Sequence, residues 1–262
     1  MSGTHSMDAP SSLAFEQLAR GVRDLVRRES ATVFFTFDCD AAYAAQPSLS
    51  ECLDDAERAK VARLATPLLQ RRKATARAVL RRTLAACLDL PPSHVPVHRT
   101  EQGQPQLVRG ATHMPLHISC SCSGRLAAIA LSVTGRVGVD LELLDRQRFP
   151  DAIAANMLGA REHAVFATIP LHQRLFWLAS AWVGKEALLK GLGLGLQIDP
   201  CTAEVMPLAM PAADGGSGFE GISFQGWHAQ HYCLPGAVLG VASEGPRHGV
   251  QRAQLQWAGL TR

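Results

Sequence analysis

The segment Gly138-Val139-Asp140-Leu141-Glu142 places two acidic side chains two residues apart inside an otherwise apolar run. On an extended strand this spacing points both carboxylates to one face, while Val139 and Leu141 point to the other. Acids within an apolar strand cost free energy unless they bind something. We therefore interpret this segment as a β-strand, with Asp140 and Glu142 as candidate site residues.

Residues 182–190, Trp-Val-Gly-Lys-Glu-Ala-Leu-Leu-Lys, form the second informative segment. Glu186 and Lys190 are four residues apart, so they lie above one another on a helix. Taken alone, such a pair is more often an ordinary surface ion pair that stabilises the helix only slightly. Brought together with Asp140 and Glu142, it gives three carboxylates beside an ammonium group. That combination suits phosphoryl chemistry on a metal-bound diphosphate.

The composition is that of a globular enzyme, with 47% hydrophobic and 19% charged residues among 262. A net charge of only +3 gives no indication of nucleic-acid binding. We see no signal peptide and no apolar run of membrane-spanning length, so we expect a cytoplasmic protein without a membrane partner. Seven cysteines without a C-x-x-C argue against a disulfide framework, and the Cys120/Cys122 pair lacks the further ligands of a zinc site.

The hydrophobic patterns predict an α+β fold. The order strand, helices, strands occurs twice, which predicts two similar halves that meet near residues 134–137. We expect a weakly ordered or helical leader (1–28), an N-terminal half (29–135), a C-terminal half with both motifs (136–245) and a tail (246–262). Strands are expected at 32–37, 95–99, 106–108, 116–121, 126–132, 137–142, 222–228, 230–234 and 238–242, and helices at 12–28, 54–69, 70–88, 151–157, 160–167 and 171–190, with a loop at 210–218.

The two motifs together resemble the 4′-phosphopantetheinyl transferase superfamily. The matching residues are Gly138-Val139-Asp140-Leu141-Glu142 and Trp182-x-x-Lys185-Glu186-Ala187-x-x-Lys190-x-x-Gly193-x-Gly195-Leu196. Residues 101–107 are similar to the family's x-x-G-K-P-x-L turn, and Ser121-Cys122-Ser123 to its S-H-S strand end, although Ser119-Cys120-Ser121 also fits. The likeness extends over roughly residues 50–243, and the chain length resembles the monomeric type that activates surfactin-like synthetases.

The resemblance implies two α+β halves related by a pseudo-twofold axis, with coenzyme A bound as co-substrate in the cleft between them. It implies a Mg²⁺ ion held by Asp140, Glu142 and Glu186, and it makes Glu186 and Lys190 the catalytic residues. A carboxylate near the metal, such as Glu186 acting directly or through water, is a candidate general base. The implied coenzyme-binding residues are Lys73, Gln104, Ser121, Cys122, Ser123, Lys185 and Lys190.

The implied reaction transfers the 4′-phosphopantetheine arm of coenzyme A to a serine of an apo acyl or peptidyl carrier protein. It releases adenosine 3′,5′-bisphosphate, and we expect a monomeric enzyme. Cys122 stands where the family has histidine and Gln104 where it has lysine, so we hypothesise a weaker preference for coenzyme A over its 3′-dephospho form. The alternative function is a catalytically weakened coenzyme A-binding or regulatory module. The basic residues between Arg71 and Arg82 form either a solvated helix face or a surface for phosphate or an acidic carrier.

Overall fold

The computed structural model describes residues 12–29, 32–100, 103–108, 110, 115–194, 198–207, 216–220, 222, 224–245 and 250–252. Glu101, Gln102, Gly195 and Leu196 of the sequence motifs lie outside these residues. The elements are α1 (Ser12–Glu29), β1 (Thr32–Asp38), α2 (Cys39–Ala45), η1 (Pro47–Cys52), α3 (Asp55–Ala62), α4 (Pro67–Leu88), η2 (Pro92–His94), β2 (Val97–Arg99), β3 (Pro105–Leu107), β4 (His117–Ser123), β5 (Leu126–Ser132), β6 (Val137–Leu143), η3 (Asp151–Asn156), α5 (Ala160–Thr168), α6 (Leu171–Leu192), η5 (Pro200–Thr202), β7 (Met206–Pro207), β8 (Gly216–Glu220), β9 (Trp227–Leu234), β10 (Ala237–Glu244) and β11 (Val250–Arg252).

Two largely antiparallel sheets repeat one topology. The first has the order β11-β1-β5-β4 and the second β6-β10-β9-β8-β7. In the first sheet β1 pairs with β5, and β5 pairs with β4. In the second sheet β6 pairs with β10, and β10 pairs with β9. Each half also contributes one 22-residue helix, α4 or α6. The α+β class and the two similar halves are therefore as the sequence predicts.

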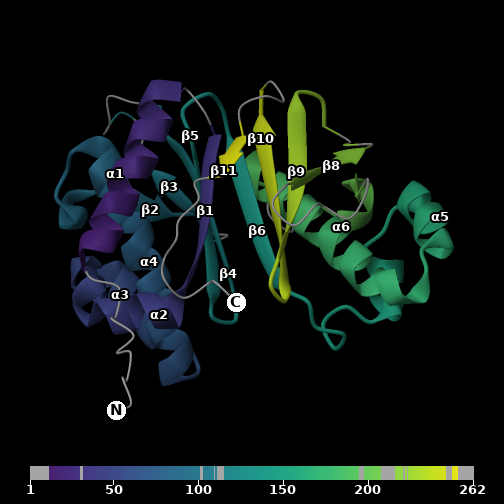
Figure 1. Ribbon diagram of the computed structural model, residues 1–262, viewed down its shortest axis with the longest axis horizontal. Coiled ribbons are helices and arrows are strands. Elements are labelled where there is room, and N and C mark those ends of the chain that lie inside the picture. Colours follow the sequence, from purple (N-terminus) through teal and green to yellow (C-terminus); the bar gives the residue numbers. More distant parts are fainter. Residues whose placement is uncertain are drawn as a thin grey trace, which may run out of the picture.

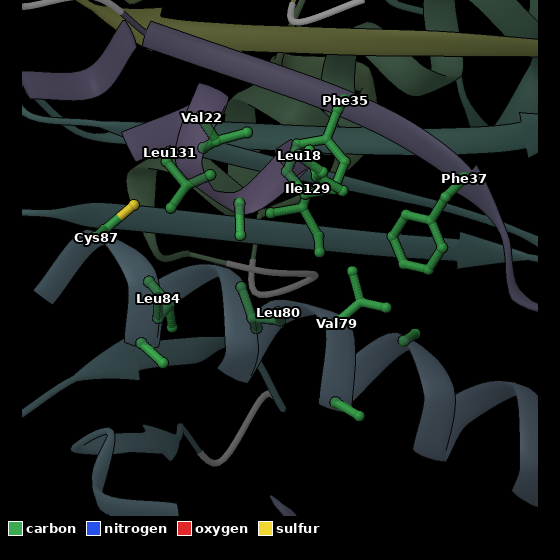
Figure 2. Packing of buried hydrophobic residues seen from close by; sticks show 14 of the residues in the cluster. Leu18, Val22, Phe35, Phe37, Val79, Leu80, Leu84, Cys87, Ile129 and Leu131 are labelled. Carbon is green, nitrogen blue, oxygen red and sulfur yellow. The ribbon is translucent and has the colours of Figure 1, made fainter. Parts of the chain in front are cut away.

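The sheets lie face to face at the centre of the molecule, with α1 and α4 outside the first and α6 outside the second (Figure 1). Alternate residues of β1 show this arrangement. Phe35 and Phe37 point outward into a core with α1 and α4, which Figure 2 shows from close by. Phe34 points inward and packs against the second sheet, where its ring centroid lies 4.6 Å from that of Tyr232.

Helix α6 lies close against its sheet because glycines remove the intervening side chains. A Cβ on Gly138 of β6 would overlap the carbonyl oxygen of Ala187, and one on Gly240 of β10 would overlap the carbonyl group of Val183. These atoms belong to helix backbone, so they have no freedom to move aside. The close approach fixes the position of α6 relative to β6, the two elements that carry the two motifs.

Helix α1 agrees with the helix predicted at 12–28, and it packs Leu18, Val22 and Val26 into the first core. Other elements differ from the sequence prediction. Strand β11, in the expected tail, pairs in parallel with β1. Strand β8 begins at Gly216, within the expected loop, and β9 begins only at Trp227. Among the described helices, none combines the length and apolar character needed to cross a membrane.

The ion pair between Arg136 and Glu244 joins the ends of β6 and β10, with Nη2 2.9 Å from Oε1. Hydrogen bonds from the Arg136 side chain lower the pKa of Glu244 from 4.5 to about 2. The pair therefore stabilises the fold fully above pH 4.5, and its contribution disappears as the pH falls toward 2. Both side chains are about 40% exposed, so we expect Glu244→Gln to cost only about 0.5–1 kcal/mol near pH 6.

Urea unfolding of both proteins at pH 6 and near pH 2 measures this difference. The exposed Glu51→Gln variant serves as the control. A cost for Glu244→Gln that is equal at both pH values would contradict the assignment.

Candidate functional site

The edge strands β4 and β6 lie side by side and join the two sheets through serine side chains. The hydroxyl of Ser119 accepts a hydrogen bond from the backbone N–H of Val139 (3.0 Å), and that of Ser123 accepts one from Leu143 (3.3 Å). Ser121 donates to Asp140. We call the contact of these three serines with β6 the serine seam. The intervening Cys120 and Cys122 point the other way, against the first core.

Asp140 and Lys190 bring the two sequence motifs into direct contact. Lys190 Nζ on α6 lies 2.5 Å from Asp140 Oδ1 on β6, and the Ser121 hydroxyl donates to the same oxygen at 2.7 Å. Burial acts to lower the pKa of Lys190, but the negative charges of Asp140 and Glu186 outweigh it, so the pKa is raised and the ammonium stays charged. Asp140 is buried, and its second oxygen, Oδ2, accepts no hydrogen bond from the described residues.

Glu142 points in the same direction as Asp140, toward β4, as two residues on one strand face must. The Ser123 hydroxyl donates to Glu142 Oε2 at 2.8 Å. Arg148, from the loop after β6, binds both carboxylate oxygens, with Nη1 2.7 Å from Oε2 and Nη2 2.9 Å from Oε1. Nothing in the sequence pattern indicated Arg148, because its contact depends on how an irregular loop folds back.

Glu186 interacts electrostatically with both strand acids, Asp140 and Glu142. Burial raises its pKa, and the charges of Asp140 and Glu142 raise it further, while Lys190 opposes them. Burial and Asp140 raise the pKa of Glu142 in the same way. Carboxylates that raise one another's pKa in this manner would be relieved by a cation.

The donor set fits a hard divalent cation such as Mg²⁺, because it offers carboxylate oxygens and a buried acceptor, Asp140 Oδ2, that no described residue satisfies. The side chains are not gathered as ligands, however. Across the described ranges, no three His, Cys, Asp or Glu side chains lie close enough together to hold a metal ion. Lys190 and Arg148 instead neutralise Asp140 and Glu142. The assignment of Asp140, Glu142 and Glu186 to one metal stays a prediction.

Lys185 does not join this group, contrary to the prediction that it binds the coenzyme. Its ammonium is fully buried on the other side of α6, 2.6 Å from Glu162 Oε2 of α5. It also donates to the carbonyl oxygens of Pro200 and Ala203, both at 2.9 Å. All three N–H groups of the ammonium are therefore used, which leaves none for a ligand. Lys185 joins α6, α5 and η5.

A cavity of about 600 Å³ opens between the two halves beside Lys190. It is lined by β3, by the starts of β4 and β6, and by the end of α6, and polar groups come from Gln104, His117 and Arg136. The predicted coenzyme residues Gln104 and Lys190 thus share one cavity.

Cys122 lies among positive charges on the opposite face of β4. Burial raises the pKa of its thiol, and Lys73, Arg99 and Lys190 oppose the rise. Arg99 has a buried Nε that donates no hydrogen bond to the described residues. Burial and the charge of Arg99 together lower the pKa of Arg77. Lys73 and Arg99 therefore lie near Cys122, and Arg77 lies near Arg99. The coenzyme-binding role of Lys73 and Cys122 stays a prediction.

Arg81 is buried, in contrast to the solvated or ligand-binding helix face that the sequence predicts for residues 71–82. It contacts Asp54 and Glu57 and donates to the carbonyl oxygens of Pro92 and Val95. Arg72 pairs with Asp40 in a bidentate contact on α2. These two arginines thus hold α4 to its neighbours.

Known proteins match the part of the chain that contains these site residues. The family model of the 4′-phosphopantetheinyl transferase superfamily matches residues 136–234, from the start of β6 to the end of β9. Residues 136–234 are therefore similar to this superfamily. The matched segment contains both motifs, the Asp140–Lys190 contact and Arg148.

Individual relatives match a similar part of the chain. The 4′-phosphopantetheinyl transferase HetI of Nostoc sp. is 29% identical over 148 residues, or 56% of this chain and 62% of HetI. A holo-[acyl-carrier-protein] synthase of Streptococcus pyogenes is 38% identical over 64 residues, or 22% of this chain and 53% of that protein. The match thus spans about six-tenths of HetI and about half of the synthase. The crystal structure of Thermotoga maritima holo-[acyl-carrier-protein] synthase aligns with a TM-score of 0.33 at 22% identity, over 43% of this chain and 64% of that one.

Proposed function

We propose that this protein transfers the 4′-phosphopantetheine arm of coenzyme A to a serine of an apo acyl or peptidyl carrier protein. One observation carries the proposal: β6 and α6 bring Asp140 and Lys190 into contact next to a cavity between the two halves, with Glu142 and Glu186 close by. The names of the relatives agree with this class of reaction. We propose further that the enzyme acts as a monomer of the surfactin-synthetase-activating type.

The residues of the site have complementary tasks in this reaction. The carrier serine oxygen attacks the β-phosphorus of coenzyme A, and the bond from that phosphorus to the bridging oxygen breaks, which releases adenosine 3′,5′-bisphosphate. Lys190 places its ammonium where the former bridging oxygen, which leaves with the 5′-phosphate of adenosine 3′,5′-bisphosphate, gains charge. Glu186, whose pKa is raised, is the candidate acceptor for the serine proton.

Asp140, Glu142 and Glu186 would hold a Mg²⁺ ion, which when bound neutralises negative charge on the diphosphate. Asp140 also keeps Lys190 charged and in place through their 2.5 Å contact. The Ser121 hydroxyl fixes the orientation of the Asp140 carboxylate. Catalysis in this arrangement comes from positioning and electrostatics.

A carrier-modification assay tests the proposal. The protein is incubated with coenzyme A, Mg²⁺ and a panel of apo carriers from fatty-acid, polyketide and peptide synthases, and the mass of each carrier is followed. We expect at least one carrier to gain the mass of the phosphopantetheine arm, and chelation of the metal to prevent this gain. Coenzyme A binding without modification of any carrier would instead favour the weakened or regulatory module.

The positive charges around Cys122 change our expectation for the 3′-phosphate. Lys73 and Arg99 supply charge that the substitutions at Gln104 and Cys122 remove, so we now expect the preference for coenzyme A over 3′-dephospho-coenzyme A to be retained. We expect Arg99→Gln to reduce this preference by about tenfold, because one charge-assisted contact is lost. The ratio of kcat/KM values for the two donors measures the effect.

The exposed Arg63→Gln variant is the control for charge alone. Equal use of both donors by the unmodified protein would instead support the weaker recognition that the sequence suggested.

A further inference from the structure

Arg148 binds the carboxylate of Glu142 as a bidentate partner. Its two terminal nitrogens lie 2.7 and 2.9 Å from the two carboxylate oxygens, and Nη1 also donates to the Ser123 hydroxyl at 3.0 Å. Paired nitrogens in this planar arrangement make one of the stronger ionic contacts in proteins. Both oxygens of Glu142 thus already face a positive charge.

The loop holds Arg148 in this position without burying it. The backbone N–H groups of Arg148 and Phe149 donate to the carbonyl oxygen of Asp145, at 3.1 and 3.0 Å, which forms a turn. Phe149 is buried in the core beneath α6. The Arg148 side chain is 48% exposed, whereas that of Glu142 is 13% exposed. The guanidinium can therefore rotate into water while its backbone stays anchored.

Arg148 disfavours the binding of a second cation at Glu142. A divalent ion bound to either carboxylate oxygen would lie within a few ångströms of the guanidinium, where like charges repel strongly. Asp140 differs, because its buried Oδ2 accepts no hydrogen bond from the described residues, whereas Lys190 and Ser121 contact Oδ1. Of the two strand acids, only Glu142 therefore has a cationic partner on both carboxylate oxygens.

We propose that Arg148 is an internal competitor for Glu142, and that its departure from the carboxylate accompanies binding of a divalent cation at this site. Only the fraction of molecules with Arg148 displaced offers Glu142 as a ligand, so the apparent metal affinity equals the intrinsic affinity multiplied by that fraction. The inference rests on the proposed function for the location of the metal. It adds that a residue outside both sequence motifs sets the metal affinity.

Calorimetric titration of the full chain with Mn²⁺, without coenzyme A or carrier, tests the inference independently of transfer. We expect Arg148→Gln to tighten Mn²⁺ binding by about threefold to tenfold, as expected for loss of a partly exposed ionic competitor. Arg146→Gln is the matched control, because Arg146 is exposed on the same loop and its loss changes the net charge equally. We expect its Mn²⁺ affinity to equal that of the unmodified protein.

The Glu142→Gln background separates competition from a general change in electrostatic potential. There, Arg148→Gln should leave the weakened Mn²⁺ affinity unchanged, since no carboxylate remains to be released. The inference would be overturned if Arg148→Gln alone bound Mn²⁺ more weakly than the unmodified protein or equally well. It would also be overturned if Arg146→Gln tightened Mn²⁺ binding to the same extent, or if no variant bound Mn²⁺. If no carrier were modified but Arg148→Gln still bound Mn²⁺ more tightly, the proposed transferase function would be refuted. The role of Arg148 as a competitor for Glu142 would still hold.

Discussion

Glu186→Gln should reduce transfer to the carrier by at least about a hundredfold, the usual effect of removing one preorganised charged group from a catalytic site. The substitution keeps the shape of the side chain and removes its charge and its basicity. Stability should not fall, because Glu186 carries a carboxylate whose pKa is raised by burial and by Asp140. Loss of that repulsion should leave the free energy of unfolding unchanged or slightly higher.

Parallel measurements of carrier mass and of urea unfolding check both parts of this prediction. Glu51→Gln, an exposed change of the same chemistry on η1, should alter neither quantity. Full transfer by Glu186→Gln would remove Glu186 from the proposed mechanism. A large loss of stability would show that the residue serves mainly to support the fold.

Lys185→Met should destabilise the protein by about 3–5 kcal/mol, because it leaves the Glu162 carboxylate buried without its cation. Both side chains of this pair are fully buried, and the ammonium also satisfies two backbone carbonyl groups. The cost is therefore that of an uncompensated charge together with two unsatisfied acceptors. Urea unfolding followed by tryptophan fluorescence measures it.

A second change identifies the origin of that cost. Glu162→Gln in the Lys185→Met background removes the stranded charge, so it should recover part of the lost stability. Lys60→Met on the exposed face of α3 is the control and should cost little. If Lys185→Met instead weakened coenzyme A binding and left stability unchanged, the coenzyme-binding role first predicted for Lys185 would be restored.

The sequence predicts the regular elements well wherever side-chain periodicity is strong. Strand β5 has the predicted bounds, 126–132, because every residue in it is buried and apolar or small. Helix α6 extends only two residues past its predicted end, to a glycine in the left-handed conformation that terminates it. Strand β8 was missed because Gly-Ser-Gly lacks the bulky side chains that usually indicate a strand.

Helix α2 was missed for a different reason. Its small residues carry little periodicity, and it begins where the Asp38 carboxylate accepts from two backbone N–H groups.

The site was partly visible in the sequence for geometric reasons. Strand and helix periodicity place Asp140 with Glu142, and Glu186 with Lys190. The same geometry argues against Lys185, because five residues along a helix separate it from Lys190 by about 140° around the axis. Helix geometry alone therefore predicts that Lys185 lies away from the site, whereas the family motif places it among the coenzyme-binding residues. The Arg148 contact and the cations around Cys122 depend on loops and distant strands, which no local pattern encodes.

The serine seam also affects how the protein behaves in concentrated solution. β4 and β6 are each the outermost strand of a sheet, and such strands readily recruit other chains. Here each covers the other, through short hydroxyl contacts from Ser119, Ser121 and Ser123. Two of these hydroxyls, those of Ser121 and Ser123, also orient the acids of the site. Protection from self-association and a correctly built site thus depend on the same small set of side chains.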